Sequence, residues 1–296
     1  MKILLLGKNG QVGYELQRTL LPLGRLVAMD RNGANLADLV HLEKLLAAET
    51  PNIIVNAAAY TAVDKAEGDQ ANANRINAEA VGVLAEHARR NQTLLVHYST
   101  DYVFDGQKSQ AYVETDVVAP QSVYGQTKQL GEALIQESKC AALVFRTSWV
   151  YSAHGNNFVK TMLRLARERD SLSIVADQFG APTSAELIAD VTALAIAAYG
   201  RQAITSGIYH LTAAGKTSWH GLASHVLQRA SDNGIHLKIT PQTLHAIPTE
   251  QYPLPARRPK NSCLNTSKLS AALGLELPDW TLHANRAIDQ LTLGNT

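Results

Sequence analysis

The first half of the chain alternates short apolar runs with longer stretches of helical spacing, and this alternation limits the fold more than any other feature. Strand character is found at residues 3–6, 26–29, 53–55, 94–97 and 143–145. Apolar residues recur at helical spacing over residues 12–21, 39–48, 77–89 and 126–137. Strands that alternate with helices form a parallel sheet covered by helices on both faces. The sequence therefore predicts an α/β fold with a doubly wound, Rossmann-type parallel sheet.

The regular alternation of strands and helices ends in the second half, where we expect a smaller lobe. Helices are predicted at 157–169, 185–199, 218–230, 267–273 and 281–291, strands at 172–175 and 207–211, and an extended loop in the Pro-rich stretch 241–259. We expect residues 1–150 to form a dinucleotide-binding core. Residues 151–296 are expected to form mainly a C-terminal α/β substrate lobe, with some segments returning to the core.

Composition narrows the class of protein. The 296 residues are 46% hydrophobic, and 27 Lys and Arg stand against 26 Asp and Glu, a net charge of +1. This balance provides no basic field for nucleic acid or an anionic membrane surface. The two cysteines, Cys140 and Cys263, do not make a disulfide framework and fit a reducing compartment, so we expect a cytoplasmic protein. The opening apolar run ends at Gly7, short of a signal peptide, and no run reaches the roughly 18 apolar residues of a membrane span.

A glycine-rich loop follows the first predicted strand and opens the first predicted helix. Gly7, Gly10 and Gly13 have the spacing G-x-x-G-x-x-G, with Gln11 and Val12 between the last two. Backbone without side chains can approach a pyrophosphate there, and the unpaired N–H groups of the helix N-terminus bind it. A tight strand-to-helix turn also explains glycines, but their position at the very start of the chain favours a dinucleotide site. This spacing is typical of short-chain dehydrogenases.

The second predicted strand ends at Asp30, followed by Arg31. An acid at this point accepts hydrogen bonds from the adenosine ribose and favours NADH, whereas an adjacent arginine can hold the extra phosphate of NADPH. The pair leaves the choice between the two cofactors open. The third predicted strand leads into small residues, Asn56 to Ala59, which would let a cofactor lie close to the backbone.

A Y-x-x-x-K pair spans the start of the predicted helix 126–137: Tyr124 lies just before it and Lys128 lies within it. Residues four apart share one helix face, so Lys128 is expected to stand near the Tyr124 phenol and favour its ionised form. Ser99 and Thr100 supply hydroxyls just past the fourth predicted strand. His97, within that strand, is expected to be a packing residue.

Longer motifs resemble the dTDP-4-dehydrorhamnose reductases, a family of the extended short-chain dehydrogenase/reductase superfamily. They are NAAAYTAVDKAE (56–67), HYSTDYVFDG (97–106), VYGQTK (123–128), FRTSWVY (145–151), NNF (156–158), DQFGAPT (177–183) and RRP (257–259). The resemblance covers nearly the whole chain. It departs from the family at Asn35 and Leu36, where an acidic residue usually contacts the adenine side.

The resemblance implies an NADPH- or NADH-dependent reduction of the C4 carbonyl of dTDP-4-dehydro-L-rhamnose to dTDP-L-rhamnose. It implies that Thr100, Tyr124 and Lys128 are catalytic, and that Asn77 completes a proton relay unless it is a plain helix residue. Implied substrate contacts are Thr100, Asp101, Tyr124, Trp149, Arg257 and Arg258. Implied cofactor contacts are Gly7, Gly10, Gln11, Val12, Gly13, Asp30, Arg31, Asn35, Leu36, Ala59, Tyr60, Thr61, Tyr124 and Lys128. Tyr102 stands where related dehydratases carry an acid, so dehydration is not expected.

Two other functions stay open at this point: reduction of another nucleotide-linked 4-ketosugar, and a non-catalytic subunit like the regulatory partner of methionine adenosyltransferase. The resemblance also implies a homodimer, and in some members a magnesium site at the interface. Glu15 and Glu186 match two of its carboxylates, whereas Gln290 replaces the third. We therefore expect any Mg²⁺ dependence to be weak, with both glutamates as solvated helix charges.

Overall fold

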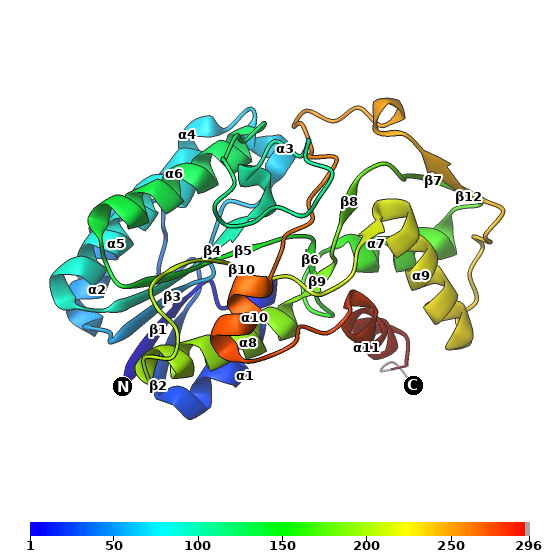
Figure 1. Cartoon of the computed structure of the whole chain (residues 1–296). Coiled ribbons are helices and arrows are strands. Elements are labelled where there is room, and N and C mark those ends of the chain that lie inside the picture. The colour runs from blue at the N-terminus through cyan, green and yellow to red at the C-terminus, as the bar shows by residue number, and fades with distance from the viewer. Residues whose placement is uncertain (294–296) are drawn as a thin grey trace.

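The chain folds around a six-stranded parallel sheet in the computed structural model, which describes residues 1–293 (Figure 1). The strands are β1 (Lys2–Leu6), β2 (Arg25–Met29), β3 (Ile53–Asn56), β4 (Leu94–Thr100), β5 (Ala142–Thr147) and β10 (Gly207–His210). Their order is β2-β1-β3-β4-β5-β10, and every neighbouring pair is parallel. This confirms the predicted doubly wound, Rossmann-type sheet.

Both faces of the sheet are buried because its strands carry apolar side chains on both. In β1, Ile3 and Leu5 join one hydrophobic cluster, whereas Leu4 and Leu6 join the other. Helices α1 (Gln11–Leu20) and α8 (Ala185–Gly200) contribute to the first cluster, and α2 (Leu39–Glu49), α5 (Ala80–Asn91) and α6 (Val123–Ser138) contribute to the second. Each fully buried Leu or Ile contributes about 1.5–3 kcal/mol, so this double core fixes the strand ends firmly.

The strand order reverses between β1 and β3, since the chain continues from β1 to β2 on one side and returns to β3 on the other. Open α/β sheets bind ligands at the carboxyl ends of the strands beside such a reversal. Here those ends lead into Gly7 and Ala57, and the next strand, β4, ends at Thr100.

The connection between β3 and α5 is made of short elements. These are α3 (Val63–Ala66), α4 (Gln70–Asn74) and a π-helical turn (Arg75–Glu79). The predicted helix over 77–89 therefore begins in a π-turn, and its regular part starts at Ala80. Such turns are frequently found at functional sites.

A group of elements from the second half, called the C-terminal lobe here, lies beside the sheet (right in Figure 1). It contains α7 (Phe158–Glu168), α9 (Trp219–Asp232), α11 (Trp280–Leu293), and the parallel strands β7 (Leu172–Val175) and β12 (Leu244–Ile247). Strand β12 corrects the expectation of a loop throughout 241–259. It is only four residues long and its register, Leu244 opposite Leu172, comes from a distant strand, so the local sequence carries little strand signal.

Other segments of the second half contact the core. Strand β10 pairs with β5, α8 packs on α1, and α10 (Ser267–Leu273) packs on β10. Two small pairs join β6 (Val150–Tyr151) to β9 (Thr183–Ser184), and β8 (Phe179–Gly180) to β11 (Thr217–Ser218). The 3-10 turns are Leu21–Leu23, Asp101–Val103 and Thr249–Gln251. Within residues 1–293, no helix has both the length and the apolar character to cross a membrane.

Candidate active site

The glycine loop lies at the carboxyl end of β1, and two of its glycines are required by close backbone contacts. Gly7 has φ +84°, and a Cβ on it would lie 2.8 Å from the Ala58 nitrogen. A Cβ on Gly13 would lie 2.0 Å from the Gly7 oxygen. Gly10 is the N-cap of α1 and offers no side chain to its first-turn N–H groups. The loop therefore fits a phosphate held by backbone N–H groups.

The side chains of Gln11 and Val12, which follow Gly10, contact other parts of the protein. The Gln11 Oε1 accepts a hydrogen bond from Asn157 Nδ2 at 2.9 Å, and its Nε2 lies 3.5 Å from the Val150 carbonyl oxygen. Val12 packs against the core. The Gln11 side chain thus links α1 to the N-terminus of α7.

At the end of β2, Asp30 is fixed by its own turn. Its Oδ1 accepts N–H groups from Asn32 at 3.0 Å and Gly33 at 3.1 Å, and Lys8 Nζ lies 3.9 Å from Oδ2. The Gly33 N–H lowers the pKa of the Asp30 carboxyl, and desolvation opposes this. Arg31 is exposed beside it. A carboxylate and two cations therefore share this edge.

The adjacent residues Asn35 and Leu36 are less available to a ligand. The Asn35 Oδ1 accepts the Ala37 N–H at 3.1 Å, and Leu36 is buried in the core. The Leu36 side chain therefore supports this edge from beneath.

The loop after β3 carries Ala59, Tyr60 and Thr61 and is held by Asn77. The Asn77 Oδ1 accepts the Tyr60 N–H at 2.8 Å, and its Nδ2 donates to the Tyr60 carbonyl and to Thr127 Oγ1, both at 3.1 Å. Both amide hydrogens are thereby used. The side chain of Asn77 positions this loop against α6 from inside the π-helical turn.

Tyr124 lies in the first turn of α6, where it meets the end of β4. The Ser122 hydroxyl caps the helix by accepting the Gly125 N–H at 3.2 Å. Burial and the charge of Asp101 raise the pKa of Tyr124 to about 12, while a hydrogen bond with Thr100 opposes this. The phenol is therefore protonated at neutral pH and has a hydroxyl neighbour.

The Lys128 side chain extends from α6 to β4. It is 1% exposed, and its Nζ lies 2.6 Å from the Tyr98 carbonyl oxygen and 3.1 Å from His97 Nε2. Burial lowers the pKa of Lys128 to about 8, and Glu132 opposes this. Burial is the main cause of the raised pKa of Tyr124, and the Lys128 nitrogen is held by the Tyr98 carbonyl of β4. The expected effect of Lys128 on the Tyr124 phenol stays a prediction.

Asp101 begins the turn after β4. It is 3% exposed, and its Oδ1 accepts the Thr100 hydroxyl at 3.0 Å. Burial raises the pKa of Asp101 to about 6, although the hydroxyls of Ser262 and Thr100 lower it. The buried Thr100 and Asp101 thus form one polar cluster with the half-buried Tyr124.

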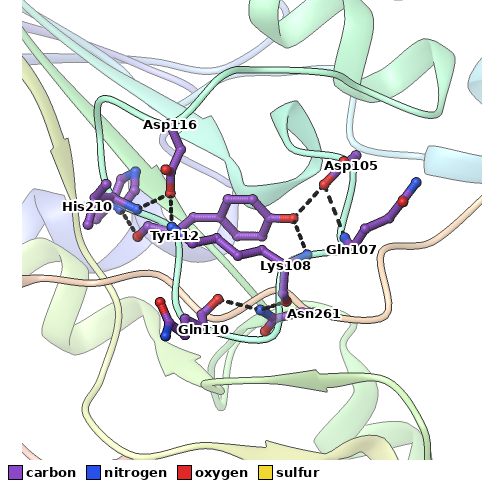
Figure 2. A network of polar contacts seen from close by, with 9 residues as sticks. Asp105, Gln107, Lys108, Gln110, Tyr112, Asp116, His210 and Asn261 are labelled. Atoms are coloured by element: carbon purple, nitrogen blue, oxygen red, sulfur yellow. Dashed lines mark hydrogen bonds and ion pairs between the residues drawn. The ribbon is translucent and has the colours of Figure 1, made fainter.

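The segment after this cluster is fixed by a network that the sequence motifs did not indicate (Figure 2). The Tyr112 hydroxyl donates to Asp105 Oδ1 at 2.6 Å, and the Tyr112 carbonyl lies 3.1 Å from His210 Nδ1. Asn261 Nδ2 donates to the carbonyls of Lys108 and Gln110, both at 2.7 Å. Residues 105–112 are therefore attached to β10 and to the C-terminal segment.

Trp149 follows β5 with φ +50°, a strained value for a large side chain. Its ring stacks on Trp219, with centroids 3.6 Å apart and planes 9° apart. A Cβ on Gly180 would lie 2.7 Å from the Trp149 ring. Trp219, which sequence reasoning missed, thus fixes Trp149 from α9.

Arg257 and Arg258 line a cleft of about 730 Å³ with Lys260 and other residues. Arg258 is already engaged: it donates to both Asp64 oxygens, at 2.6 and 3.0 Å. Arg257 is exposed. The two arginines therefore differ, and Asp64 is a partner that sequence reasoning did not identify, since it lies in α3, 194 positions away.

Glu15 and Glu186 are partly buried, at 15% and 19% side-chain exposure, which corrects the expectation that both are solvated. Burial and the charge of Glu186 raise the pKa of Glu15. Arg286 Nε lies 2.9 Å from Glu186, and Gln290 is exposed. In the described part of the chain, no three His, Cys, Asp or Glu side chains are grouped to hold a metal.

Comparisons with known proteins agree with this geometry. The family described as "RmlD substrate binding domain" matches residues 1–293. A dTDP-4-dehydrorhamnose reductase of Burkholderia thailandensis is 51% identical over 286 residues, 95% of each chain. A reductase of that name from Clostridium acetobutylicum has a structure with TM-score 0.90 at 34% identity, covering 98% of this chain and 99% of that one. Another, from Bacillus anthracis in complex with NADP, has TM-score 0.87 at 32% identity, covering 98% and 99%.

The family model and the relatives span nearly the whole chain, core and C-terminal lobe together. The fold and the placement of the Gly loop, Tyr124 and Lys128 agree with that assignment. The chain therefore belongs to the dTDP-4-dehydrorhamnose reductase family.

Proposed function

We propose that this chain reduces the C4 carbonyl of dTDP-4-dehydro-L-rhamnose to give dTDP-L-rhamnose, with NADPH or NADH as reductant. This is the last step in making the activated sugar. The observation that carries the proposal is the place of the Tyr124 phenol, in the first turn of α6 and beside the Thr100 hydroxyl at the carboxyl end of β4. Carbonyl reduction requires a proton donor at such a position, next to the carbonyl oxygen.

The cofactor is held along the carboxyl ends of β1, β2 and β3. The contacts proposed there are Gly7, Gly10, Gly13, Asp30, Arg31, Ala59, Tyr60 and Thr61, with Tyr124 and Lys128 at the nicotinamide end. Gln11, Val12, Asn35 and Leu36 are proposed to contact the cofactor through their backbone, since their side chains are engaged with protein. The tight Gly7 and Gly13 contacts and the N-cap Gly10 fit a pyrophosphate. When bound, the reduced nicotinamide supplies the hydride for the carbonyl carbon.

Three residues take part in the proton transfer to the C4 oxygen. Tyr124 donates its phenolic hydrogen to the C4 oxygen, and Thr100 hydrogen-bonds the same oxygen and orients it. Lys128 stabilises the phenolate that remains and holds the nicotinamide ribose. Asn77 supports them by fixing the Tyr60 backbone to α6.

The substrate lies between the core and the C-terminal lobe. Asp101 accepts a sugar hydroxyl, and Trp149, fixed by Trp219, packs on the deoxysugar ring. Arg257 and Arg258 bind the diphosphate in the cleft of about 730 Å³. Because Asp64 already holds Arg258, the diphosphate must compete with a carboxylate there.

We infer further that the protein works in the cytoplasm as a homodimer, without nucleic acid or membrane as partner. The charge balance supports the absence of nucleic-acid and membrane partners, since 27 cationic and 26 anionic side chains leave almost no net field. Glu15 and Glu186 each have an arginine nearby, so Mg²⁺ contributes little to the dimer.

The test is reduced-nicotinamide oxidation with the dTDP-4-keto sugar made from dTDP-glucose by a dehydratase and an epimerase. NMR of the product should show dTDP-L-rhamnose. A different 6-deoxysugar would indicate another ketosugar reductase, and no oxidation with a folded protein would favour a non-catalytic subunit.

A further inference from the structure

Three buried polar side chains form a chain beneath the candidate active site. Asn56, at the end of β3, is 1% exposed, His97 on β4 is 0% exposed, and Lys128 on α6 is 1% exposed. Asn56 and His97 are direct partners in the β3–β4 register. Asn56 Nδ2 lies 3.2 Å from His97 Nδ1, and His97 Nε2 lies 3.1 Å from Lys128 Nζ. Of these three side chains, only Lys128 has a role in the proton transfer described above.

The main chain determines which way this chain of hydrogen bonds runs. The Asn56 Oδ1 accepts the Ala58 N–H at 3.2 Å, so the Asn56 Nδ2 is the atom turned to His97. An amide nitrogen only donates, and His97 Nδ1 must therefore accept. The ring hydrogen of a neutral imidazole is then on Nε2, where it faces Lys128 Nζ.

An N–H aimed at the lysine nitrogen favours the amine over the ammonium, because an ammonium has donors only. Protonating Lys128 leaves two donors opposed, or forces the Asn56 amide to turn and abandon the Ala58 N–H. His97 does not resolve the conflict by taking a charge, since burial and Lys128 hold its pKa well below the usual value.

The other groups around Lys128 are few. The Tyr98 carbonyl on β4 accepts from either form of the lysine. Glu132, on the same helix, favours the ammonium but is paired with Arg146 of β5 at 2.6 Å. Tyr124 lies four residues earlier on α6, and Asp101 lies past the end of β4.

We propose that His97 is a positioning residue for the reduction: held by Asn56, it fixes the Lys128 nitrogen and favours its amine form, which makes the lysine the donor that reprotonates Tyr124. In that step an Nζ–H bond breaks and the phenolate gains the hydrogen, leaving the amine that His97 stabilises. The His97 N–H favours this direction, because it stabilises the amine that the transfer leaves on Lys128. This inference rests on the role proposed for Lys128.

The tautomer is tested first, on the full-length wild-type protein without ligands. ¹⁵N NMR of labelled histidine distinguishes the two neutral tautomers, and a His97→Gln sample identifies the His97 signals by their loss. We expect hydrogen on Nε2 and none on Nδ1. A neutral ring with hydrogen on Nδ1 would overturn the inference, and this measurement needs no variant to be active.

The second test is the pH profile of kcat/KM for the keto sugar at saturating NADPH. Activity should fall as pH rises through the pKa of Lys128, because the ammonium is the required form. His97→Leu removes the opposing N–H and should move this alkaline limb up by about one pH unit, a tenfold change in proton concentration. A limb that stays in place or moves down contradicts the proposal.

Two further variants separate positioning from simple packing. His97→Gln offers an oxygen to Asn56 and an N–H to Lys128, so it should keep the wild-type limb. His210→Leu is the matched control, because His210 is also 0% exposed on a strand of the sheet but contacts the Tyr112 carbonyl. It should lower stability without moving the limb, and a shift equal to that of His97→Leu would show a general packing effect and overturn the proposal.

The Lys128→Met variant distinguishes a failure of this inference from a failure of the proposed function. If that variant keeps wild-type turnover, the role given to Lys128 is wrong, and the donor role of His97 falls with it. If turnover is lost while His97 carries hydrogen on Nδ1, the role of Lys128 stands and only the inference about His97 fails.

Discussion

Replacing Tyr124 with phenylalanine separates chemistry from folding. The substitution deletes one hydroxyl and keeps the edge contact with the Tyr102 ring, whose centroid is 5.6 Å away. The Thr100 hydroxyl keeps Asp101 as its acceptor at 3.0 Å, so no buried donor is left unpaired. The loss in unfolding free energy should therefore stay within the roughly 0.5–1.5 kcal/mol of one hydrogen bond. Turnover should fall at least about 100-fold, the contribution of a general acid.

The assay is single-turnover oxidation of NADPH with saturating keto sugar, together with thermal unfolding of the same samples. Tyr98→Phe is the matched control, because its hydroxyl bonds Thr192 at 2.8 Å and has no place in the proposed chemistry. We expect the control to keep turnover within about twofold of the wild type, which is a barrier change below ~0.5 kcal/mol. A folded Tyr124→Phe protein with near-normal turnover would refute the assignment of the acid.

Four other predictions follow from contacts elsewhere in the protein. Arg257→Ala with Arg258→Ala should raise KM for the dTDP-sugar about tenfold or more with NADPH affinity unchanged, whereas Asp64→Asn should release Arg258 and tighten dTDP binding about two- to fivefold. Calorimetric titration with dTDP measures the dTDP affinity of each variant. An affinity equal to that of the wild type in either one contradicts the clamp. Glu132→Gln should lower stability by about 3–5 kcal/mol in chemical denaturation, because it leaves Arg146, 3% exposed, without its buried partner; a loss below about 1 kcal/mol would count against that pair. Sedimentation with Mg²⁺ and then with excess chelator should show a dimer in both, and complete dissociation on chelation would mean that the metal holds it.

The fold could be predicted because each core strand is a local apolar run. β1 carries buried residues on both faces, Leu4 and Leu5 among them, and such a run is typical of a doubly covered parallel strand. Strand β12 could not be predicted in the same way. Its partner β7 lies far away in sequence, and its central residues, His245 and Ala246, are exposed.

The residues of the candidate site could be chosen by motif, but their partners could not. The Y-x-x-x-K spacing indicated Tyr124 and Lys128 and said nothing of His97, since a histidine within a strand is usually a packing residue. Asp64 reaches Arg258 across 194 positions, and Trp219 of α9 reaches Trp149 in the loop after β5. Spacing along one helix also gave no indication of the Tyr98 carbonyl or the His97 ring that hold the Lys128 nitrogen, because both belong to the adjacent sheet.

The central claim is that this chain delivers a hydride to C4 of a nucleotide-linked keto sugar while Tyr124 protonates the oxygen. Reduced nicotinamide carrying deuterium at its transferable C4 position tests it most directly, with NMR of the sugar product. The account predicts one deuterium on the sugar C4 carbon, loss of the carbonyl signal, and a rate that falls at least about 100-fold in Tyr124→Phe. Deuterium at another carbon, or an unlabelled product, would contradict it.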